Sequence, residues 1–448
     1  MYEILTSLAA VIVVLGVMIT VHEIGHFAAA KYFKVRVEQF AIGFGKRLIG
    51  FRRGETEYRI NLLPLGGYVK MSGENPMDAK TGDPGEFTSH PRWQRFIIAA
   101  AGPAMNILLA VVLLTGVYTV RYDRPAYLDN PAVVGWVLEN SPAEQAGIQP
   151  GDRIVRVDDV QNPTWEDLLS RMVLGAEHPL DVAVQRDNQV MQKTIAPAEL
   201  GKGEEFRNPG LLPDEPNVVT EIQPDLPAAL AGIQKGDVIV AIDGQATRSM
   251  SAVVRYVQQS AGKPVEVDLV RNGVEQKVTV TPRTVTDDGG NLVYRLGVLL
   301  GTRSDTQVGS SLPFGQALAK SVEHNKKNSL LILELVKRMF KGQVSMKQVE
   351  GPIRIAQVSG QAARQDGWLP LLTLMAVISL NLGIFNLFPF PILDGGVILL
   401  LAIEGIRRRD ISLKVKEKIY QAAFVLLILF AVAVIYNDLV KTLPGVMQ

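Results

Sequence analysis

The chain opens with an apolar stretch that leaves few choices of fold. Residues 4–21 carry no charged side chain, and the apolar run resumes at 27–30. The only charged residue before the run is Glu3, and the run is too long for the apolar core of a secretory signal peptide. We therefore expect residues 4–30 to form a retained transmembrane helix.

Three ionisable side chains interrupt this apolar run. His22 and His26 are four residues apart, so both can face one metal ion on a helix. Glu23 falls within the same arc, where a carboxylate can take a proton from water. A chance occurrence on a buried helix is the weaker alternative, because ionisable groups are costly at membrane depth. The pattern predicts a zinc peptidase site in or beside the bilayer.

Composition narrows the class of protein further. Hydrophobic residues make up 47% of the 448 residues and gather at both ends, while the middle is typical of soluble β-rich sequence. A chain of this length suggests about three domains. The net charge of +1 provides no basic surface for nucleic acid. The absence of cysteine excludes disulfides and thiolate metal sites.

Three more membrane segments are expected, at 96–120, 368–406 and 419–436. The segment 96–120 contains small residues at 99–104 that permit close helix contact, and a polar Asn106. The segment 368–406 is too long for one straight crossing.

Prolines and glycines interrupt the segment 368–406. Pro389 and Pro391 remove helix hydrogen bonds, and Gly395 and Gly396 loosen the turn that follows. Irregular backbone at this depth survives where protein or a water-filled cavity satisfies it. Asp394 lies at this break, either as a helix cap or as a third metal ligand facing the first helix.

Lysine and arginine are unevenly distributed among the loops. They are frequent in 31–95 and 407–418, whereas the first few residues have none and the tail has only Lys441. By the positive-inside rule, both termini and the large middle region lie outside, and the loop 31–95 is cytoplasmic. The candidate metal ligands then lie near the cytoplasmic side of the membrane.

The middle region contains a repeat. Residues 141–159 and 226–244 are identical at 11 of 19 positions, at an offset of 85 residues. A repeat of this size is a small domain rather than a solenoid unit. We expect one copy at 131–215 and the other at 216–300.

Each copy resembles the PDZ domains of bacterial proteases, which accept an extended peptide as an added strand. The resemblance implies loops that bind a chain-terminal carboxylate at Gly297 and Val298, and more weakly at Gly210 and Leu211. Rigid spacers are the alternative reading. After the repeat, the segment 310–345 has the pattern of an amphipathic helix, which would lie on the outer membrane surface or pack against the PDZ pair.

Three motifs together are specific enough to name a family. His22 to His26 reads HEIGH, 101–106 reads AGPAMN, and 386–396 reads NLFPFPILDGG. Their order and spacing resemble the site-2 intramembrane metalloproteases. The resemblance implies that His22, His26 and Asp394 bind one zinc ion per chain and that Glu23 is the general base.

The same resemblance implies where substrate binds. It assigns substrate contacts to Asn386 and Pro389, and a re-entrant β-hairpin to residues 35–72. The loop has strand-like alternation, with glycines that allow turns and close backbone approach. An ordinary cytoplasmic hairpin is the alternative. The hairpin residues expected to meet substrate are Gly43, Phe44, Gly66 and Gly67.

These expectations combine into one architecture. We predict a polytopic α-helical membrane protein with four transmembrane segments, the third one broken, and two tandem periplasmic PDZ domains. Its membrane parts would be 1–120 and 368–448, set in a bacterial inner membrane and its lipid.

The resemblance implies a zinc endoprotease that cleaves single-span membrane proteins already trimmed on their outer side. Its substrates would include the anti-sigma factor of the sigma-E stress response and remnant signal peptides, with the PDZ pair as a size filter. A membrane-anchored PDZ adaptor without catalysis is one alternative. A metal-handling transporter fits less well, because the sequence has no inverted repeat.

Overall fold

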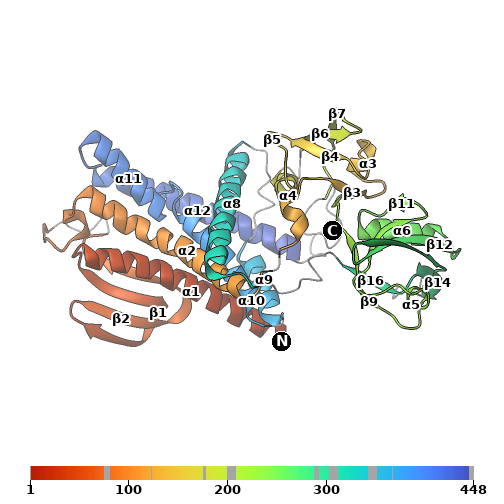
Figure 1. Cartoon of the computed structure of the whole chain (residues 1–448). Helices are drawn as coiled ribbons and strands as arrows, with labels where there is room; N and C mark the ends of the chain where they lie inside the picture. The colour runs from red at the N-terminus through yellow and green to blue at the C-terminus, as the bar shows by residue number, and fades with distance from the viewer. Residues whose placement is uncertain are drawn as a thin grey trace. The chain divides into compact units, whose positions relative to one another are not determined.

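The computed structural model describes residues 2–74, 81–122, 124–174, 178–198, 208–286, 292–301, 311–341, 351–365 and 367–442. The chain divides into two compact units (Figure 1). The helical unit comprises Met1–Val120, Ser311–Val336 and Met346–Gln448. The β-rich unit comprises Arg121–Ser310 and Lys337–Ser345.

Long apolar helices build the helical unit. Four helices within the described ranges are long and apolar enough to cross a membrane: Leu5–Tyr32, Arg92–Val120, Leu369–Asn386 and Leu413–Asp438. In full, the helices of the unit are α1 (Tyr2–Tyr32), α2 (Arg92–Val120), α8 (Phe314–Phe340), α9 (Pro352–Arg364), α10 (Leu369–Asn386), α11 (Asp394–Arg407) and α12 (Leu413–Thr442), with a 3-10 turn η1 (Phe87–Ser89).

The predicted segment 368–406 is two helices, α10 and α11, separated by 387–393. Both pack along α2. The Ser379 hydroxyl of α10 donates to the carbonyl of Asn106 at 2.8 Å. Beyond the end of α11, Asp410 pairs with Arg92 at the start of α2, at 2.7 Å. The 14 residues of α11 extend about 21 Å, too short to cross alone, so the break divides one membrane segment into two parts.

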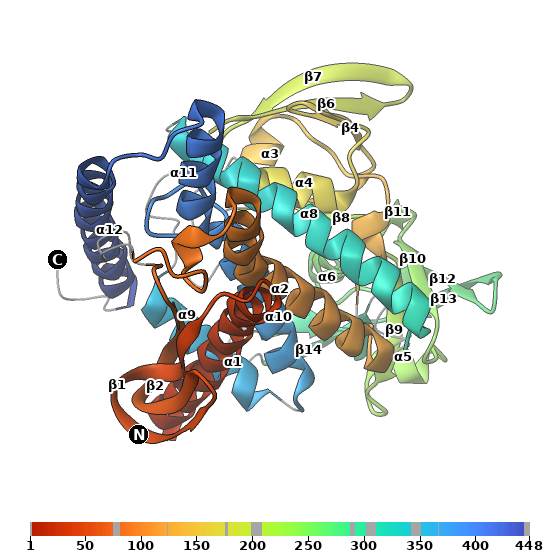
Figure 2. The same ribbon diagram turned by 90° about the vertical axis from the view of Figure 1, so that its left-hand side faces the viewer.

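Helices α8 and α12 attach to the unit through buried polar contacts. In α8 the Ser321 hydroxyl donates to the carbonyl of Val111 in α2 at 2.8 Å, and Ile332 packs against the apolar cluster of Ala110 and Leu380. In α12 the buried Asp438 accepts from the backbone amides of Gly351 and Ile353 at 2.9 and 3.1 Å, at the start of α9. The middle of α12 stands apart from the other helices (Figure 2).

The strands β1 (Val37–Arg53) and β2 (Thr56–Met71) form more than the predicted hairpin. Phe40 pairs with both Tyr58 and Val69, because each long strand bends and pairs twice. The resulting order of stretches is 67–71, 37–42, 57–61 and 47–53, which places 67–71 at one edge. Gly43 and Gly66 lie at the bends, with φ of +84° and +126° that side chains with a Cβ rarely adopt.

Two lobes of similar design build the β-rich unit. The first lobe contains β3 (Val134–Val137), α3 (Pro142–Gln145), β4 (Arg153–Val157), β5 (Val160–Gln161), α4 (Trp165–Leu174), β6 (Leu180–Arg186), β7 (Gln189–Ile195) and β8 (Leu211–Pro213), preceded by a 3-10 turn η2 (Ala126–Asp129). Its strands pair in the orders β5-β4-β6-β7 and β3-β8.

The second lobe repeats this succession of elements. It contains β9 (Asn217–Ile222), α5 (Pro227–Leu230), β10 (Val238–Ile242), β11 (Gln245–Ala246), α6 (Met250–Gln259), β12 (Val265–Arg271), β13 (Val274–Val280), β14 (Arg283–Thr286), β15 (Leu292–Arg295) and β16 (Val298–Gly301). The main order is β13-β12-β10-β9-β16, so β16 is an edge strand, as β8 is in the first lobe.

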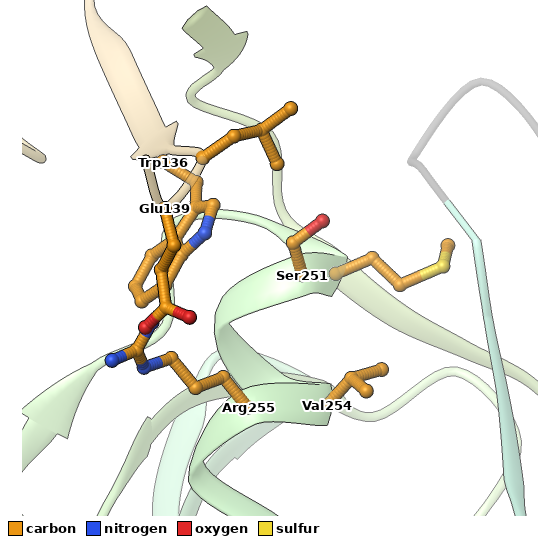
Figure 3. Close-up of a pocket in the computed structure, with 7 residues that line it drawn as sticks. Trp136, Glu139, Ser251, Val254 and Arg255 are labelled. Atoms are coloured by element: carbon orange, nitrogen blue, oxygen red, sulfur yellow. The ribbon is translucent and has the colours of Figure 1, made fainter. Parts of the chain in front are cut away.

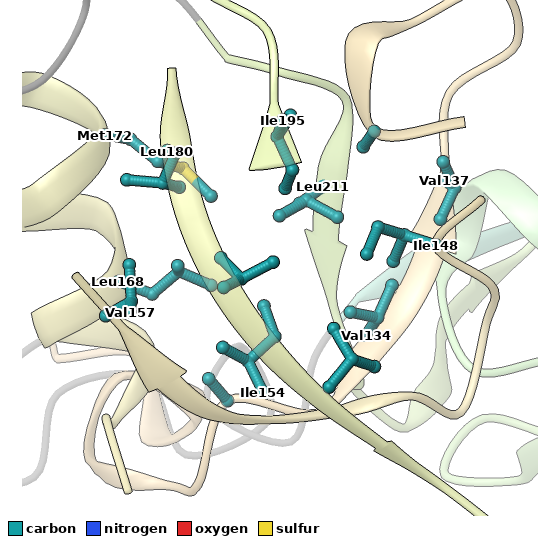
Figure 4. Close-up of a cluster of buried hydrophobic side chains, with 14 of the residues drawn as sticks. Val134, Val137, Ile148, Ile154, Val157, Leu168, Met172, Leu180, Ile195 and Leu211 are labelled. Carbon is teal, nitrogen blue, oxygen red and sulfur yellow. The ribbon is translucent and has the colours of Figure 1, made fainter. Parts of the chain in front are cut away.

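Each lobe has its own apolar core. In the first lobe Ile154, Leu168 and Leu211 belong to a cluster of fully buried side chains between the strands and α4 (Figure 4). In the second, Ile239 and Leu269 occupy the corresponding cluster. Separate cores explain why the sequence repeat coincides with two small modules rather than one larger domain.

Candidate metal centre

Three predicted ligands converge inside the helical unit. The Nε2 atoms of His22 and His26 are 3.1 Å apart, and Asp394 places its two carboxylate oxygens 3.1 Å from His22 Nε2 and 3.4 Å from His26 Nε2. Both histidines are buried. Within the described ranges, no other group of three His, Asp or Glu side chains is arranged to hold a metal.

These separations fit a tetrahedral zinc ion. Zinc–nitrogen and zinc–oxygen bonds of about 2.0–2.1 Å place neighbouring tetrahedral ligands about 3.4 Å apart. The observed distances of 3.1, 3.1 and 3.4 Å lie close to that value. Three protein ligands leave the fourth position for water or substrate, which is the arrangement of a catalytic site. The residues therefore fit zinc.

The far nitrogen of each histidine ring is also engaged. His26 Nδ1 donates to the carbonyl of Ile98 in α2 at 2.8 Å, which turns its Nε2 toward the cluster. His22 Nδ1 lies 3.1 Å from the side-chain amide of Asn106, also in α2. Outer contacts of this kind fix the orientation of metal-binding histidines.

Glycines bring α1 and α2 together at this point. A Cβ on Gly102 would lie 2.3 Å from His26 Nε2 and 2.8 Å from His22 Nε2, in the space where the ligand nitrogens meet. A Cβ on Gly25 would lie 2.4 Å from the carbonyl oxygen of Ala101. The glycine of HEIGH and that of AGPAMN therefore allow the close crossing of the two helices.

The break after α10 positions the third ligand. Asp394 is the first residue of α11, and no side chain caps this helix, so the structure does not support the helix-cap reading. Gly395 and Gly396 face the carbonyl oxygens of Leu387 and Phe390, where a Cβ would lie within 2.3 Å of an oxygen. Only glycine allows the loop to fold against the start of α11, and this fold turns Asp394 toward α1.

Glu23 lies at the edge of the sheet. Its Cγ would be 3.5 Å from a Cβ on Gly67, and the backbone amide of Val69 faces its carboxylate. Both residues belong to the edge stretch 67–71 of β2. The base candidate is thus located between the histidines and a strand edge.

The other predicted hairpin residues surround the bends. The carbonyl of Gly43 accepts from the buried Asn61 side chain at 2.9 Å. The ring of Phe44, 45% exposed, covers Gly66 and stacks on Tyr68 with ring centres 6.2 Å apart. An added Cβ at Gly66 would lie 2.3 Å from that ring.

Asn386 and Pro389 flank the break. Asn386 is the last residue of α10 and is half-buried, and Pro389 is exposed in the loop that leads to Asp394. No described residue forms a hydrogen bond with the Asn386 side chain. Its amide is therefore available to a ligand.

The two candidate carboxylate-binding loops have matching geometry. Gly297 and Gly210 have φ of +89° and +98° and lie beside the edge strands β16 and β8. The carbonyl of Gly297 accepts from the amide of Gln223 at 2.9 Å, and that of Gly210 from Leu138 at 2.8 Å. Val298 is half-buried, whereas Leu211 is part of the core.

A shallow pocket of about 390 Å³ lies between the lobes of the β-rich unit (Figure 3). Arg255 of α6 stacks over Trp136 of β3, 5.6 Å from the ring centre, and pairs with Glu139. Met250 and Val254 line the same pocket from α6. The residues that line it include no group of nucleophilic or metal-binding side chains, so it is separate in kind from the candidate metal centre.

Comparison with known proteins gives the family. Residues 10–430 match the profile of peptidase family M50. The chain is 35% identical to the regulator of sigma-E protease RseP of Salmonella typhimurium (strain 14028s / SGSC 2262), over 98% of this chain and 99% of that protein. It is 34% identical to the protein of the same name from Escherichia coli K12, over 98% and 99%. A putative zinc metalloprotease of Vibrio cholerae is 32% identical, over 98% and 100%.

Solved structures resemble one fifth of the chain. The PDZ domain of an SdrC-like protein from Listeria monocytogenes is 23% identical with a TM-score of 0.17, over 20% of this chain and 90% of that one. The PDZ domain of an SdrC-like protein from Listeria innocua is 25% identical with a TM-score of 0.18, over 20% and 97%.

Proposed function

The chain belongs to peptidase family M50 and is a zinc metallopeptidase, and on this premise we propose that it hydrolyses single-span membrane proteins within the bilayer. The proposal assigns zinc binding to His22, His26 and Asp394 and the general base to Glu23. One observation carries it: the ligand atoms of three residues approach one another within 3.1–3.4 Å, beside a carboxylate, among helices long and apolar enough to span a membrane.

The chain's own residues divide the chemistry between them. When bound, zinc would act as a Lewis acid, which lowers the pKa of water and polarises the carbonyl group of the peptide bond. Glu23 accepts the proton from the attacking water and later delivers it to the leaving amine. The Asn386 amide, which has no partner among the described residues, would hold the peptide or its developing oxyanion.

The edge stretch 67–71 of β2 would hold the substrate in an extended form. A transmembrane helix hides its carbonyls in hydrogen bonds, so its backbone must unwind before hydrolysis. An extended peptide beside 67–71 would run past Glu23, because Gly67 and Val69 both adjoin that side chain. Phe44 would cover the peptide at the bend, next to Gly66 and Gly43.

Exposed apolar side chains support a re-entrant position for the sheet. Leu48, Ile49 and Phe51 are 58%, 70% and 62% exposed, and Leu62 and Leu63 are 55% and 53% exposed. Such a patch in water would favour association, whereas lipid covers it without cost. We therefore propose that the sheet dips into the cytoplasmic side of the membrane.

The distribution of Lys and Arg favours an inner-membrane protein whose termini and β-rich unit lie in the periplasm. The lobes would act as PDZ modules whose peptide edges are β8 and β16, beginning at Leu211 and Val298. Relatives named as regulators of sigma-E protease favour an anti-sigma factor as substrate. The β-rich unit would then exclude substrates that retain a bulky periplasmic domain.

Zinc content and cleavage test the core of this proposal. Purified full-length protein should hold one zinc per chain and cut a tagged single-span substrate in detergent. Glu23→Gln should keep the zinc and lose at least ~10²–10⁴-fold in rate, because only the proton acceptor is removed. A membrane-anchored adaptor would hold no zinc and cut nothing, and near-normal turnover by Glu23→Gln would reject Glu23 as the base.

Deletion of 131–300 tests the filter separately. Cells carrying the deletion variant should cleave a substrate that retains its outer domain, while full-length enzyme cleaves only the trimmed form. The double variant with Glu23→Gln is the control for background proteases. If the deletion variant folds, cuts trimmed substrate and still rejects the untrimmed one, the filter lies outside the two lobes.

A further inference from the structure

Asn106 is a polar residue in the middle of α2 that the proposed chemistry does not use. It is 0% exposed, and its side-chain Oδ1 has no hydrogen-bond partner among the described residues. Its Nδ2 lies 3.1 Å from His22 Nδ1. A buried amide costs free energy when one of its polar atoms lacks a hydrogen bond, so this arrangement calls for an explanation.

The position of the histidine proton decides how this amide must be oriented. A neutral imidazole carries one proton, and His22 Nε2 must be free of it to bind a metal beside Asp394. The proton then sits on Nδ1, which needs an acceptor. An Nδ2–H group facing Nδ1 would place two donors against each other. The two ends of an amide are distinguished only by their hydrogen bonds, so the end that faces His22 is Oδ1.

We propose that Asn106 is a positioning residue whose Oδ1 accepts the Nδ1–H of His22, which fixes the tautomer that presents Nε2 to zinc. This inference rests on the zinc site of the proposed function. His26 offers the matching case, since its Nδ1 meets the carbonyl of Ile98 at 2.8 Å. Helix α2 thus supplies one oxygen acceptor to each histidine, one from its backbone and one from Asn106.

The surroundings of Asn106 hold that acceptor in place. Its carbonyl receives the buried Ser379 hydroxyl at 2.8 Å, and α10 approaches so closely that a Cβ on Gly383 would lie 3.3 Å from Asn106 Cβ. Helix α10 therefore fixes the backbone position of Asn106 in α2, and the Asn106 side chain in turn orients the ring of His22 in α1. Outer partners of metal-binding histidines typically contribute about 10–100-fold to metal affinity.

The test compares two near-isosteric variants of the purified full-length protein. Asn106→Leu removes the acceptor and should weaken zinc about 10–100-fold in chelator competition, with a shifted d–d spectrum after cobalt substitution. Asn106→Asp keeps an oxygen acceptor and should retain zinc affinity within a few-fold. If Asn106→Leu does not fold, Asn106→Ala makes the same comparison with Asn106→Asp. The melting temperature of each metal-free variant separates loss of folding from loss of the acceptor.

Two controls separate this inference from the zinc site itself. Ser379→Ala loses the contact with the Asn106 backbone but leaves the side-chain acceptor, so zinc affinity should fall less than in Asn106→Leu. His22→Ala should abolish tight zinc binding, and if it does not, the proposed zinc site fails. If His22→Ala loses zinc while Asn106→Leu binds it as tightly as the parent, only the role of Asn106 is overturned. Equal weakening in Asn106→Leu and Asn106→Asp would overturn it as well.

Discussion

The carboxylates in the cores of the two lobes and the carboxylate at the candidate metal centre have opposite surroundings. In the β-rich unit, Asp152 and Asp237 are each 1% exposed, and each receives two bonds from an arginine and one from a backbone amide. In the helical unit, Asp394 faces the Nε2 atoms of His22 and His26, which also face each other. Among the described residues, no arginine or lysine forms an ion pair with Asp394.

The difference separates structural from functional use of one residue type. A buried carboxylate with every oxygen paired stabilises the fold around it and needs nothing further. Ligand atoms that point at one another have unfavourable electrostatics until a cation lies between them. The same comparison predicts which substitutions change chemistry and which change stability.

The largest effect is expected for Asp394→Asn. A neutral amide is a poor zinc ligand, so zinc affinity should fall at least ~100-fold and cleavage should stop, because even outer partners contribute 10–100-fold. Amide exchange in the β-rich unit should be unchanged. Zinc titration and hydrogen exchange on one sample measure both, with the exposed Asp225→Asn as a control. Tight zinc binding by this variant would place the third ligand elsewhere.

The next largest effect is expected for Gly102→Ala. The added methyl would lie 2.3 Å from His26 Nε2, so α1 and α2 must separate and zinc affinity should fall at least ~10-fold. Gly116→Ala in the same helix is the matched control, since no atom lies within 4 Å of its added Cβ. Chelator competition compares the two variants. Equal zinc affinity in both would mean that the crossing of α1 and α2 does not support the site.

A smaller and purely structural effect is expected for Asp237→Ala. The Arg271 guanidinium and the Gln234 backbone amide lose their acceptor, so local unfolding of the second lobe should become about 10-fold more frequent. Zinc content and cleavage of a trimmed substrate should stay at parent levels. Hydrogen exchange followed by mass spectrometry locates the change, and a loss of zinc would contradict the division between the units.

The smallest expected effect is a pH dependence of the stability of the second lobe, which arises from the pair of Asp237 and Arg271. Burial raises the pKa of Asp237, but the hydrogen bonds from Arg271 and the Gln234 amide outweigh it and hold that pKa below 3.8. The stabilisation is therefore complete above about pH 4 and is lost as the pH falls through the lowered pKa. Exchange protection of the second lobe should fall a few-fold on acidification. Asp237→Asn should lack this component, and an identical profile in parent and variant would exclude Asp237 as its source.

Features that depend on periodicity or on short motifs could be predicted from the sequence. An apolar run with two histidines four apart is sufficient to predict α1 and the approach of His22 to His26, because helix geometry alone brings them to one face. The proline and glycine pattern likewise predicts the break before Asp394. The family expected from these motifs is confirmed by the profile match over residues 10–430. The buried pair of Asp237 and Arg271 also had a signal, since Asp152 and Arg186 recur at the same spacing.

Features that depend on tertiary contacts could not be predicted from the sequence. The double pairing of β1 with β2 depends on where long strands bend, so the sequence predicted a simple hairpin and not the edge beside Glu23. Helix α9 was not predicted, because the side chain that accepts from the amides at its start belongs to Asp438, which is far away in the sequence. Asp438 accepts from Gly351 and Ile353. Asn106 was visible as a polar residue in an apolar span, but its partner could be identified only after α1 and α2 were packed together.

The placement of Asp394 in the chain has a consequence for biosynthesis. The candidate ligands His22 and His26 lie on α1, and Asp394 lies on α11, which is synthesised after both lobes. Synthesis of the chain between His26 and Asp394, at about 5–20 residues per second, takes on the order of tens of seconds. A nascent chain therefore carries both lobes well before the candidate zinc ligands can come together. If the lobes exclude untrimmed substrates as proposed, the filter is synthesised before the site that it guards.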